Sequence, residues 1–363
     1  AFASDASSAA PTLADSFGIS GYVGNASTKI VNNSGFSPSL VWLKDRSSSG
    51  NHYWQDTIRG LTSQISSNST AAETTFTSNI TSFNDNGYTL GTATDTNAQN
   101  HAFVGWQWKA DSVPTVNTDG TIQSVVSANQ AAAFSIVKWG GTGSASTVGH
   151  GLSSAPEMVI VKKLGATQDW FVYNNYLDAS TPARYYLTLD SSDAKGDNGA
   201  SGGSVFNSTS PTATVFSTGT TLQESSDYIA YCFTSISGFS KMGSYTGTGV
   251  TGNTVAVGFQ PDFVMVKASS TNEPWFLLDS VRNPINPRDN RLMADSTAAE
   301  DTGSVHTIDF NATSFILNGT VGNGTNGSGQ TYIYMAYKMN PPALSIPTGE
   351  MAFLNVAGGG GGG

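Results

Sequence analysis

One sequence pattern occurs three times along the chain, and it constrains the fold more than any other feature. The pattern begins with a glycine, continues through a short spacer that contains proline, and runs into an alternating apolar strand followed by lysine. Its copies start at Gly35 (GFSPSLVWLKD), Gly151 (GLSSAPEMVIVKK) and Gly258 (GFQPDFVMVKA). The period of about a hundred residues is too long for a solenoid repeat and matches the size of a whole domain. The sequence therefore predicts three modules built to one plan.

Three further landmarks follow the first in the same order within each copy. One is a strand around a tryptophan, and we assign Trp54, Trp170 and Trp275 to the same place in the repeat. The next is a glycine between two apolar stretches, which we interpret as a hairpin with a type I′ turn. The last is an aromatic closing strand. The hairpin segments are 82–91, 214–223 and 314–322, and the closing strands are 101–109, 227–235 and 331–339.

Short apolar runs at a period of two, such as LVWLK, MVIVK and FVMVK, indicate β-strands bounded by turn-forming residues. The spacing of these runs predicts an all-β chain of three tandem antiparallel β-sandwiches that are jelly-roll-like in outline. The closing strands are apolar at nearly every position, as expected for central strands covered on both faces. The predicted organisation is an N-terminal arm at 1–15, a first module at 16–110, a linker at 111–132, a second module at 133–237, a third module at 238–340 and a Pro/Gly-rich tail at 341–363.

Composition narrows the classes of function. Only 12% of the residues are charged, and the 16 Lys and Arg residues are scattered in a chain of net charge −10, which argues against nucleic-acid binding by charge. No stretch reaches the ~18 apolar residues of a membrane span, so no membrane insertion is expected. The N-terminal stretch lacks the basic start and apolar core of an intact signal peptide. The lone Cys232 is expected to be a small buried strand residue.

Residue types that could bind metal or catalyse a reaction do not form a recognisable pattern. Asp190, Asp193 and Asp197 lie near glycines, as in calcium loops, but they lack the ligand register and closing Glu of an EF-hand. A solvated polar loop is the alternative reading of this stretch. No nucleophile elbow is present, and we predict no metal, cofactor or catalytic residue. The histidines, none at ligand spacing to another His or Cys, are His52, His101, His150 and His306.

Carboxylates and tryptophans that recur in the repeat are expected to serve structure. Asp56, Asp178 and Asp279 follow the tryptophans at similar offsets, so we interpret them as equivalent rather than as an acid–base pair. The repeated tryptophans, and Trp106 and Trp108 in a closing strand, could stack on sugar rings, but core packing is the favoured interpretation. A binding face is expected in the variable loops at 174–186 and 280–292.

Taken together, the landmarks resemble an uncharacterised repeat of tailed-bacteriophage virion proteins. The first copy carries the likeness most fully, in GFSPSLVWLK from Gly35, HYWQD, SFNDNGYTLG and the closing AFVGWQWKA. The likeness covers 16–340 and contains no catalytic motif, so it implies a setting more than a reaction. The final run of glycines also resembles the tips and linkers of fibrous phage proteins. In the second and third copies, Trp106 and Trp108 are replaced by Tyr231 and Phe233, then by Met335 and Tyr337.

We therefore expect a non-enzymatic structural protein at the virion surface, in an extracellular setting, as a tail fibre or receptor-binding component. The resemblance implies contacts with other virion subunits, a homo-oligomer that is expected to be a trimer, and binding to a host surface glycan or protein. Two alternatives stay open. One is a subunit of an extracellular filament or adhesin, and the other is a glycan depolymerase, which would need two carboxylates facing each other across a groove.

Overall fold

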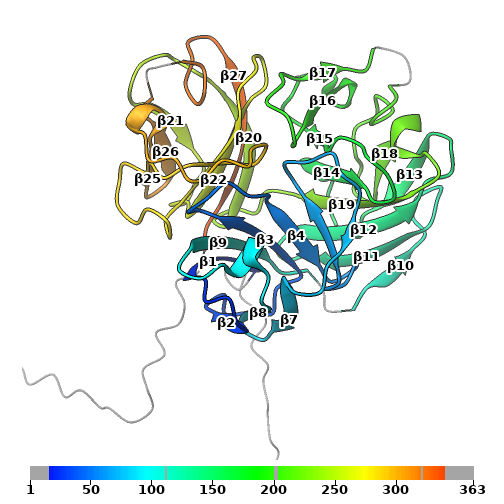
Figure 1. Ribbon diagram of the computed structural model, residues 1–363. Helices are drawn as coiled ribbons and strands as arrows, with labels where there is room; N and C mark the ends of the chain where they lie inside the picture. The colour runs from blue at the N-terminus through cyan, green and yellow to red at the C-terminus, as the bar shows by residue number, and fades with distance from the viewer. Residues whose placement is uncertain (1–15, 111–112, 200–202, 320–321, 340–363) are drawn as a thin grey trace, which may run out of the picture.

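The computed structural model describes residues 16–110, 113–199, 203–319 and 322–339, and it is built almost entirely of antiparallel strands (Figure 1). The all-β fold predicted from the sequence is thus confirmed. The helical content consists of a single short α-helix, α1 (Thr94–Asn97), and short 3-10 turns at Pro182–Arg184, Thr220–Leu222 and Ser304–His306 in this part of the chain. The predicted N-terminal arm at 1–15 and the tail at 341–363 lie outside the described residues.

The first copy of the pattern forms one large and one small sheet. In the large sheet, the first strand pairs with the closing strand, which pairs in turn with the strand that carries the repeated lysine. The order of the large sheet is β1 (Phe17–Val23), β9 (Ala102–Trp108), β3 (Leu40–Asp45), β4 (Tyr53–Asp56), β5 (Ser63–Ser66) and β6 (Thr74–Thr75), and that of the small sheet is β2 (Lys29–Asn32), β8 (Gly87–Leu90) and β7 (Ile80–Asn84).

The second copy repeats this strand order and adds two strands at one edge. The added strands lie within the stretch predicted as a linker. The order of its large sheet is β10 (Thr115–Asn117), β11 (Ser124–Asn129), β12 (Phe134–Gly140), β19 (Asp227–Phe233), β14 (Met158–Lys163), β15 (Phe171–Asn174), β16 (Tyr185–Thr188) and β17 (Gly196–Asp197), and its small sheet pairs β13 (Ser146–Gly149) with β18 (Val215–Thr218).

The third copy has the same order again. We call the three large sheets the first, second and third sheets; the division into three autonomous domains stays a prediction. The order of the third sheet is β20 (Ser240–Thr246), β27 (Thr331–Tyr337), β22 (Phe263–Ala268), β23 (Trp275–Asp279) and β24 (Leu292–Met293), and its small sheet is β21 (Asn253–Ala256), β26 (Ser314–Leu317) and β25 (Ile308–Asn311).

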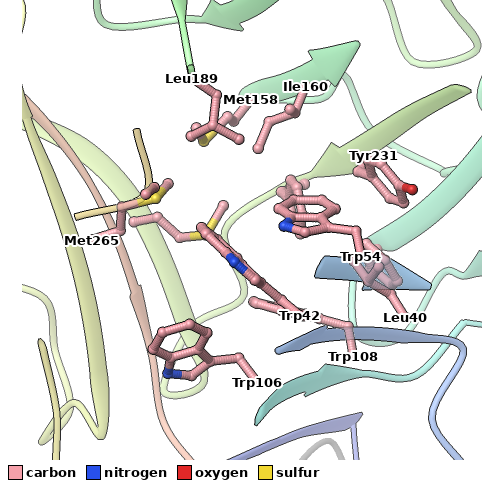
Figure 2. Packing of buried hydrophobic residues seen from close by; sticks show 14 of the residues in the cluster. Leu40, Trp42, Trp54, Trp106, Trp108, Met158, Ile160, Leu189, Tyr231 and Met265 are labelled. Carbon is pink, nitrogen blue, oxygen red and sulfur yellow. The ribbon is translucent and has the colours of Figure 1, made fainter. Parts of the chain in front are cut away.

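Each large sheet is buried on both faces. On β27, Tyr332 and Tyr334 face a cluster shared with the third small sheet, whereas Ile333, Met335 and Tyr337 face a central core. The alternation follows from the period of two along a strand. The central core takes side chains from all three large sheets, and Figure 2 shows tryptophans and methionines of different sheets converging there. The small sheets lie at the periphery (Figure 1). The closing strands are therefore covered on both sides, as their composition predicted.

The three large sheets form a closed ring, because each one contacts both others through equivalent groups. The repeated lysine at the end of β3, β14 and β22 is buried, and its ammonium group donates to a loop carbonyl of the neighbouring copy and to one in its own copy. Burial lowers the pKa of each of these lysines to about 8. The contacts between copies run from Lys44 to the Thr297 carbonyl (3.1 Å), from Lys162 to the Thr70 carbonyl (2.7 Å) and from Lys267 to the Ser192 carbonyl (2.9 Å).

Two backbone hydrogen bonds accompany the lysine at every junction between sheets. They hold the loop after one strand against the loop of the neighbouring copy, in the same arrangement each time. The donor amides are those of Glu73 and Gln168 at the first–second junction, Lys195 and Glu273 at the second–third junction, and Gly50 and Glu300 at the first–third junction.

The strand register corrects the equivalence that we assigned to the tryptophans. Trp54 pairs across the strands with Trp42, as Leu277 pairs with Met265 in the third sheet. Trp275 stands two residues before Leu277, so its place in the first sheet belongs to His52 and not to Trp54. Because we matched the tryptophans by residue type alone, we aligned the first copy two residues out of register. A shift of two residues leaves each side chain on the same face of the strand, so the burial pattern did not reveal the error.

The hairpin interpretation of the third landmark is also wrong in detail. The turn between β7 and β8 has no positive φ at Asp85 or Asn86, so it is not type I′, and in the third copy the turn lies at 312–313, before the Asn–Gly pair. Gly87 is required for a different reason. It has φ 143°, and a Cβ there would lie 1.9 Å from the carbonyl oxygen of Val31 on the neighbouring strand β2.

We predict that Lys267→Met lowers the free energy of unfolding by about 1–3 kcal/mol, because the Ser192 and Glu273 carbonyls lose a charged donor at a partly buried junction. Lys138→Met provides the matched control, since the Lys138 ammonium pairs with Asp227 at an exposed position and its loss should cost about 0–1 kcal/mol. Denaturant unfolding of both variants measures the difference. Equal losses would show that the junction lysine has no special role.

Candidate functional site

The histidines are separated in space. His101 pairs through Nδ1 with Asp45 at 2.8 Å, His150 lies 3.1 Å from the Thr212 carbonyl, and the His306 ring packs against Phe276. His52 is buried in the first sheet. Within 16–110, 113–199, 203–319 and 322–339, no three His, Cys, Asp or Glu residues lie close enough to hold a metal ion.

The three aspartates of the candidate calcium loop do not converge. Asp190 accepts the backbone N–H of Trp170 at 3.0 Å, Asp193 accepts a neighbouring serine hydroxyl, and Asp197 forms a bidentate pair with Arg184 at 2.8 and 2.6 Å. The Arg184 hydrogen bonds lower the pKa of Asp197 to about 2. Burial raises the pKa of Asp190 to about 6, although the Trp170 N–H opposes the shift. Each of the three aspartates therefore binds a different group of the protein itself, and their carboxylates do not form a shared calcium site.

Asp190 has a counterpart in each of the other copies. The side chain two residues after the strand accepts the backbone N–H at the start of the neighbouring strand, and so fixes the loop that reaches the junction. The three contacts are Asp190 with the Trp170 amide, Asp295 with the Trp275 amide at 2.9 Å, and Asn68 with the His52 amide at 2.7 Å.

The repeated carboxylates also need a correction. Asp56 and Asp279 are equivalent, but the strand register places Asn174 and not Asp178 in the second copy. Asp178 caps a surface turn by accepting the amides of Ser180 and Thr181, which explains how a similar offset misled the comparison.

A buried ion pair accompanies the carboxylate in the first and third copies, and the second copy has neutral residues at both places. Arg282 contacts Asp279 at 2.6 Å, with neither side chain exposed, and Arg59 contacts Asp56 in the same way. The second copy has Leu177 three residues after its asparagine. Two of the three copies thus contain a buried arginine–aspartate pair near the central core.

The residue on the closing strand of the neighbouring sheet varies between copies together with this pair. The Tyr231 hydroxyl donates to Asp56 at 2.7 Å, and the Trp106 indole N–H donates to Asp279 at 3.1 Å. Met335 holds the equivalent place on β27 and has no N–H or O–H group. Asn174 is neutral, and its amide nitrogen, itself a donor, has no hydrogen-bond partner among the described residues. Where the neighbouring closing strand has a hydrogen-bond donor, the residue at this place is an aspartate. Where that strand has Met335, the residue is the neutral Asn174.

The tryptophans predicted to pack in the core do so. Trp54 is buried, and its ring lies 4.8 Å from that of Trp42, 5.2 Å from that of Trp170 and 4.8 Å from that of Tyr231. These rings come from two sheets, so they join the sheets rather than present a stacking surface (Figure 2). Cys232 is also buried, as expected, and burial raises the pKa of its thiol to about 12. The residues buried in this way include Trp106, Trp108 and Trp275.

A surface groove of about 640 Å³ lies beside the two added strands β10 and β11. Val126, Ala128 and Leu152 contribute apolar lining, whereas amide and charged side chains provide polar lining. The first and third sheets have no strands in the place of β10 and β11 in the described ranges, so the groove has no equivalent beside them; the end of the first copy, at Lys109 and Ala110, completes its lining. The polar lining residues are Lys109, Thr115, Asn117, Asp119, Asn129 and Gln130.

Sequence reasoning missed this groove because its strands lie in the stretch interpreted as a linker. The β-branched run around Val125 and Val126 was the available signal. The two loops expected to form a binding face lie elsewhere. The first contains a 3-10 turn, and the second contains the exposed Ile285 and a cis Asn286–Pro287 bond.

Three large sheets of one strand order around a shared core define an all-β repeat protein. The chain belongs to the family described as a domain of unknown function, DUF7483, whose model matches residues 13–341 and so spans all three copies. No curated protein and no solved structure matches the chain at a significant level. Helices with the length and apolar character needed to cross a membrane are absent from the described ranges.

We predict that Tyr231→Phe destabilises the protein by about 1–3 kcal/mol, because buried Asp56 loses a hydrogen-bond donor. Tyr53→Phe is the matched control. It removes a hydroxyl that donates to the exposed Asp95 at 2.7 Å, where water can replace it. Thermal or denaturant unfolding should separate the two variants, and a smaller loss for Tyr231→Phe would contradict the junction role of the tyrosine.

We predict that Asp190→Asn stabilises the protein at pH 7 by about 1–2 kcal/mol and has little effect near pH 4. The folded-state pKa of Asp190 is raised from 3.8 to about 6, so its contribution to stability is complete below pH 3.8 and is lost as the pH rises through 6. Asparagine occupies the equivalent place at Asn68 and can still accept the amide. Unfolding midpoints of both proteins between pH 4 and 7 test this, and a constant difference would contradict it.

Proposed function

We propose that the protein is a non-enzymatic structural component of a phage virion, a tail fibre or receptor-binding component that contacts the host surface. The proposal rests on one observation: the repeated residues are used inside the molecule. The lysines bind carbonyls across the junctions, and the tryptophans and the aspartate–arginine pairs are buried. The residues that make the repeat recognisable, from Gly35 onward, are thus the residues that pack the three sheets of the chain against one another. It supports a role as a rigid scaffold.

Surface recognition is then assigned to the features that the repeat does not share. The groove beside β10 and β11 combines an apolar lining with several amides, a combination that suits hydrogen bonding to hydroxyl groups of a glycan. Asp119 is the one carboxylate among the described residues that line this groove, whereas a glycan depolymerase needs two. The groove therefore favours binding over hydrolysis.

Multiple copies on the particle would convert weak contacts into firm attachment. Each chain offers one such groove, and a homo-oligomer, which we expect to be a trimer in a virion, would present several to the same surface. In this proposal affinity arises from the number of linked sites and not from any single contact.

We predict that the isolated protein is retained on a glycan array or on envelope material of its host, and that Lys109→Ala together with Gln130→Ala reduces retention by about tenfold or more. Lys29→Ala, on the small sheet of the first copy, serves as the matched control and should bind as the unaltered protein does.

Two outcomes would contradict the proposal. If no host surface material retains the protein, the receptor-binding part fails, and the architectural part stands alone. If electron microscopy of native particles labelled with an antibody to this chain shows no label on a virion, the setting itself is wrong. A label along a continuous cell-surface filament would favour the filament or adhesin alternative.

A further inference from the structure

The junction between the first and third sheets differs from the other two in how the chain connects it. The chain passes directly from the first sheet to the second, and from the second to the third, but no segment links the first sheet directly to the third. Only non-covalent contacts therefore close the ring at this point. A junction without a covalent connection lacks the high effective concentration that a short connection provides.

This junction also has a different residue at the place of the repeated tryptophan. Trp170 donates its indole N–H to the Ser66 carbonyl at the first–second junction, and Trp275 donates to the Thr188 carbonyl at the second–third junction. His52 occupies the equivalent place at the first–third junction. A buried titratable side chain therefore stands at the one junction that no covalent connection supports.

The hydrogen bond that His52 makes defines its tautomer. Its Nδ1 accepts the indole N–H of Trp42 at 2.9 Å, so a neutral ring carries its proton on Nε2. On the side of the third sheet, the backbone at Met293 and Ser296 lies near the ring, but the buried Nε2 has no hydrogen-bond partner among the described residues. Protonation would place a second donor at Nδ1, directly opposite the Trp42 N–H, and would remove this bond.

The charged groups around His52 oppose a further positive charge. Burial is the main cause that lowers the pKa of His52 well below its ordinary value, and Lys44 from β3 and Arg282 from the loop after β23 lower it further. The carboxylates nearby are already engaged. Asp279 and Glu300 both pair with Arg282, and Glu300 also forms a bidentate pair with Arg46 of the first copy at 2.9 and 2.7 Å.

We propose that His52 is an acid-sensitive latch: its protonation opens the first–third junction while the other two junctions, which have tryptophan at this place, stay closed. In the opened junction the imidazole is solvated and titrates near its ordinary value. The stability contributed by the closed latch is therefore complete above pH 6.5 and is lost as the pH falls toward the depressed closed-state value. Because one proton is taken up on opening, the opening equilibrium should rise about tenfold for each pH unit in this range.

Amide hydrogen exchange tests the latch, because every junction has two equivalent backbone hydrogen bonds that serve as internal controls. Exchange is measured on the full chain at pH 6 and pH 5, and each rate is divided by the intrinsic rate at that pH. We expect protection to fall about tenfold at the first–third junction and not to fall at the others, where protonation of Asp190 can only add protection. The amides compared are Gly50 and Glu300 against Glu73, Gln168, Lys195 and Glu273.

Variants at His52 separate the latch from general acid destabilisation. His52→Gln can still accept the Trp42 N–H but does not titrate, so the fall in protection at Gly50 and Glu300 should disappear. His52→Trp combined with Trp42→Ile copies the Trp170 and Ile160 arrangement of the second sheet, and it provides a second non-titrating junction if glutamine packs poorly.

Each variant is judged by how its amide protection changes between pH 6 and pH 5, and not by the protection at one pH. His150→Gln replaces a buried histidine of the second copy, away from the first–third junction, and should keep the fall in protection. The proposal is overturned if all six amides lose protection alike between pH 6 and pH 5. It is also overturned if the fall at Gly50 and Glu300 persists in His52→Gln.

Discussion

A sheet that is apolar on both faces must be covered twice, and this requirement shapes the whole molecule. One face of each large sheet is covered by its own small sheet, and the other can be covered only by the remaining large sheets. When three such sheets enclose a common core, the inner apolar face of each is covered by the other two. The buried lysines then become possible, because each junction brings loop carbonyls close enough to replace the water that a buried ammonium loses.

The sequence allowed a good part of this fold to be predicted, because strand composition is a local property. Period-two runs and the order of landmarks indicated the all-β class and the repeat, and the closing strands indicated burial on both faces. Register was harder, since we matched the copies by tryptophan. A count from the lysine would have succeeded: Trp170 and Trp275 each stand eight residues after theirs, and His52 stands eight residues after Lys44.

The junction chemistry could not be read from the chain because it depends on which strand faces which loop. Asp56 and Asp279 each accept a hydrogen bond from the closing strand of another copy, whereas Met335 holds the equivalent place on β27. Once the ring is known, the differences become paired substitutions within one sequence: hydroxyl or indole with aspartate, thioether with asparagine. The groove escaped prediction for a simpler reason: its two short strands lie between two repeat copies and match no landmark of the repeat, so the β-branched run at Val125 and Val126 was passed over.

Fusing three copies in one chain frees each copy from the symmetry that identical subunits would impose. In an assembly of three identical chains, an insertion such as β10 and β11 would appear three times around the axis, and each appearance would have to be accommodated. Here it appears once per ring. A single mutation in the β10–β11 insertion therefore alters one place per ring, whereas the same mutation in three identical chains would alter three.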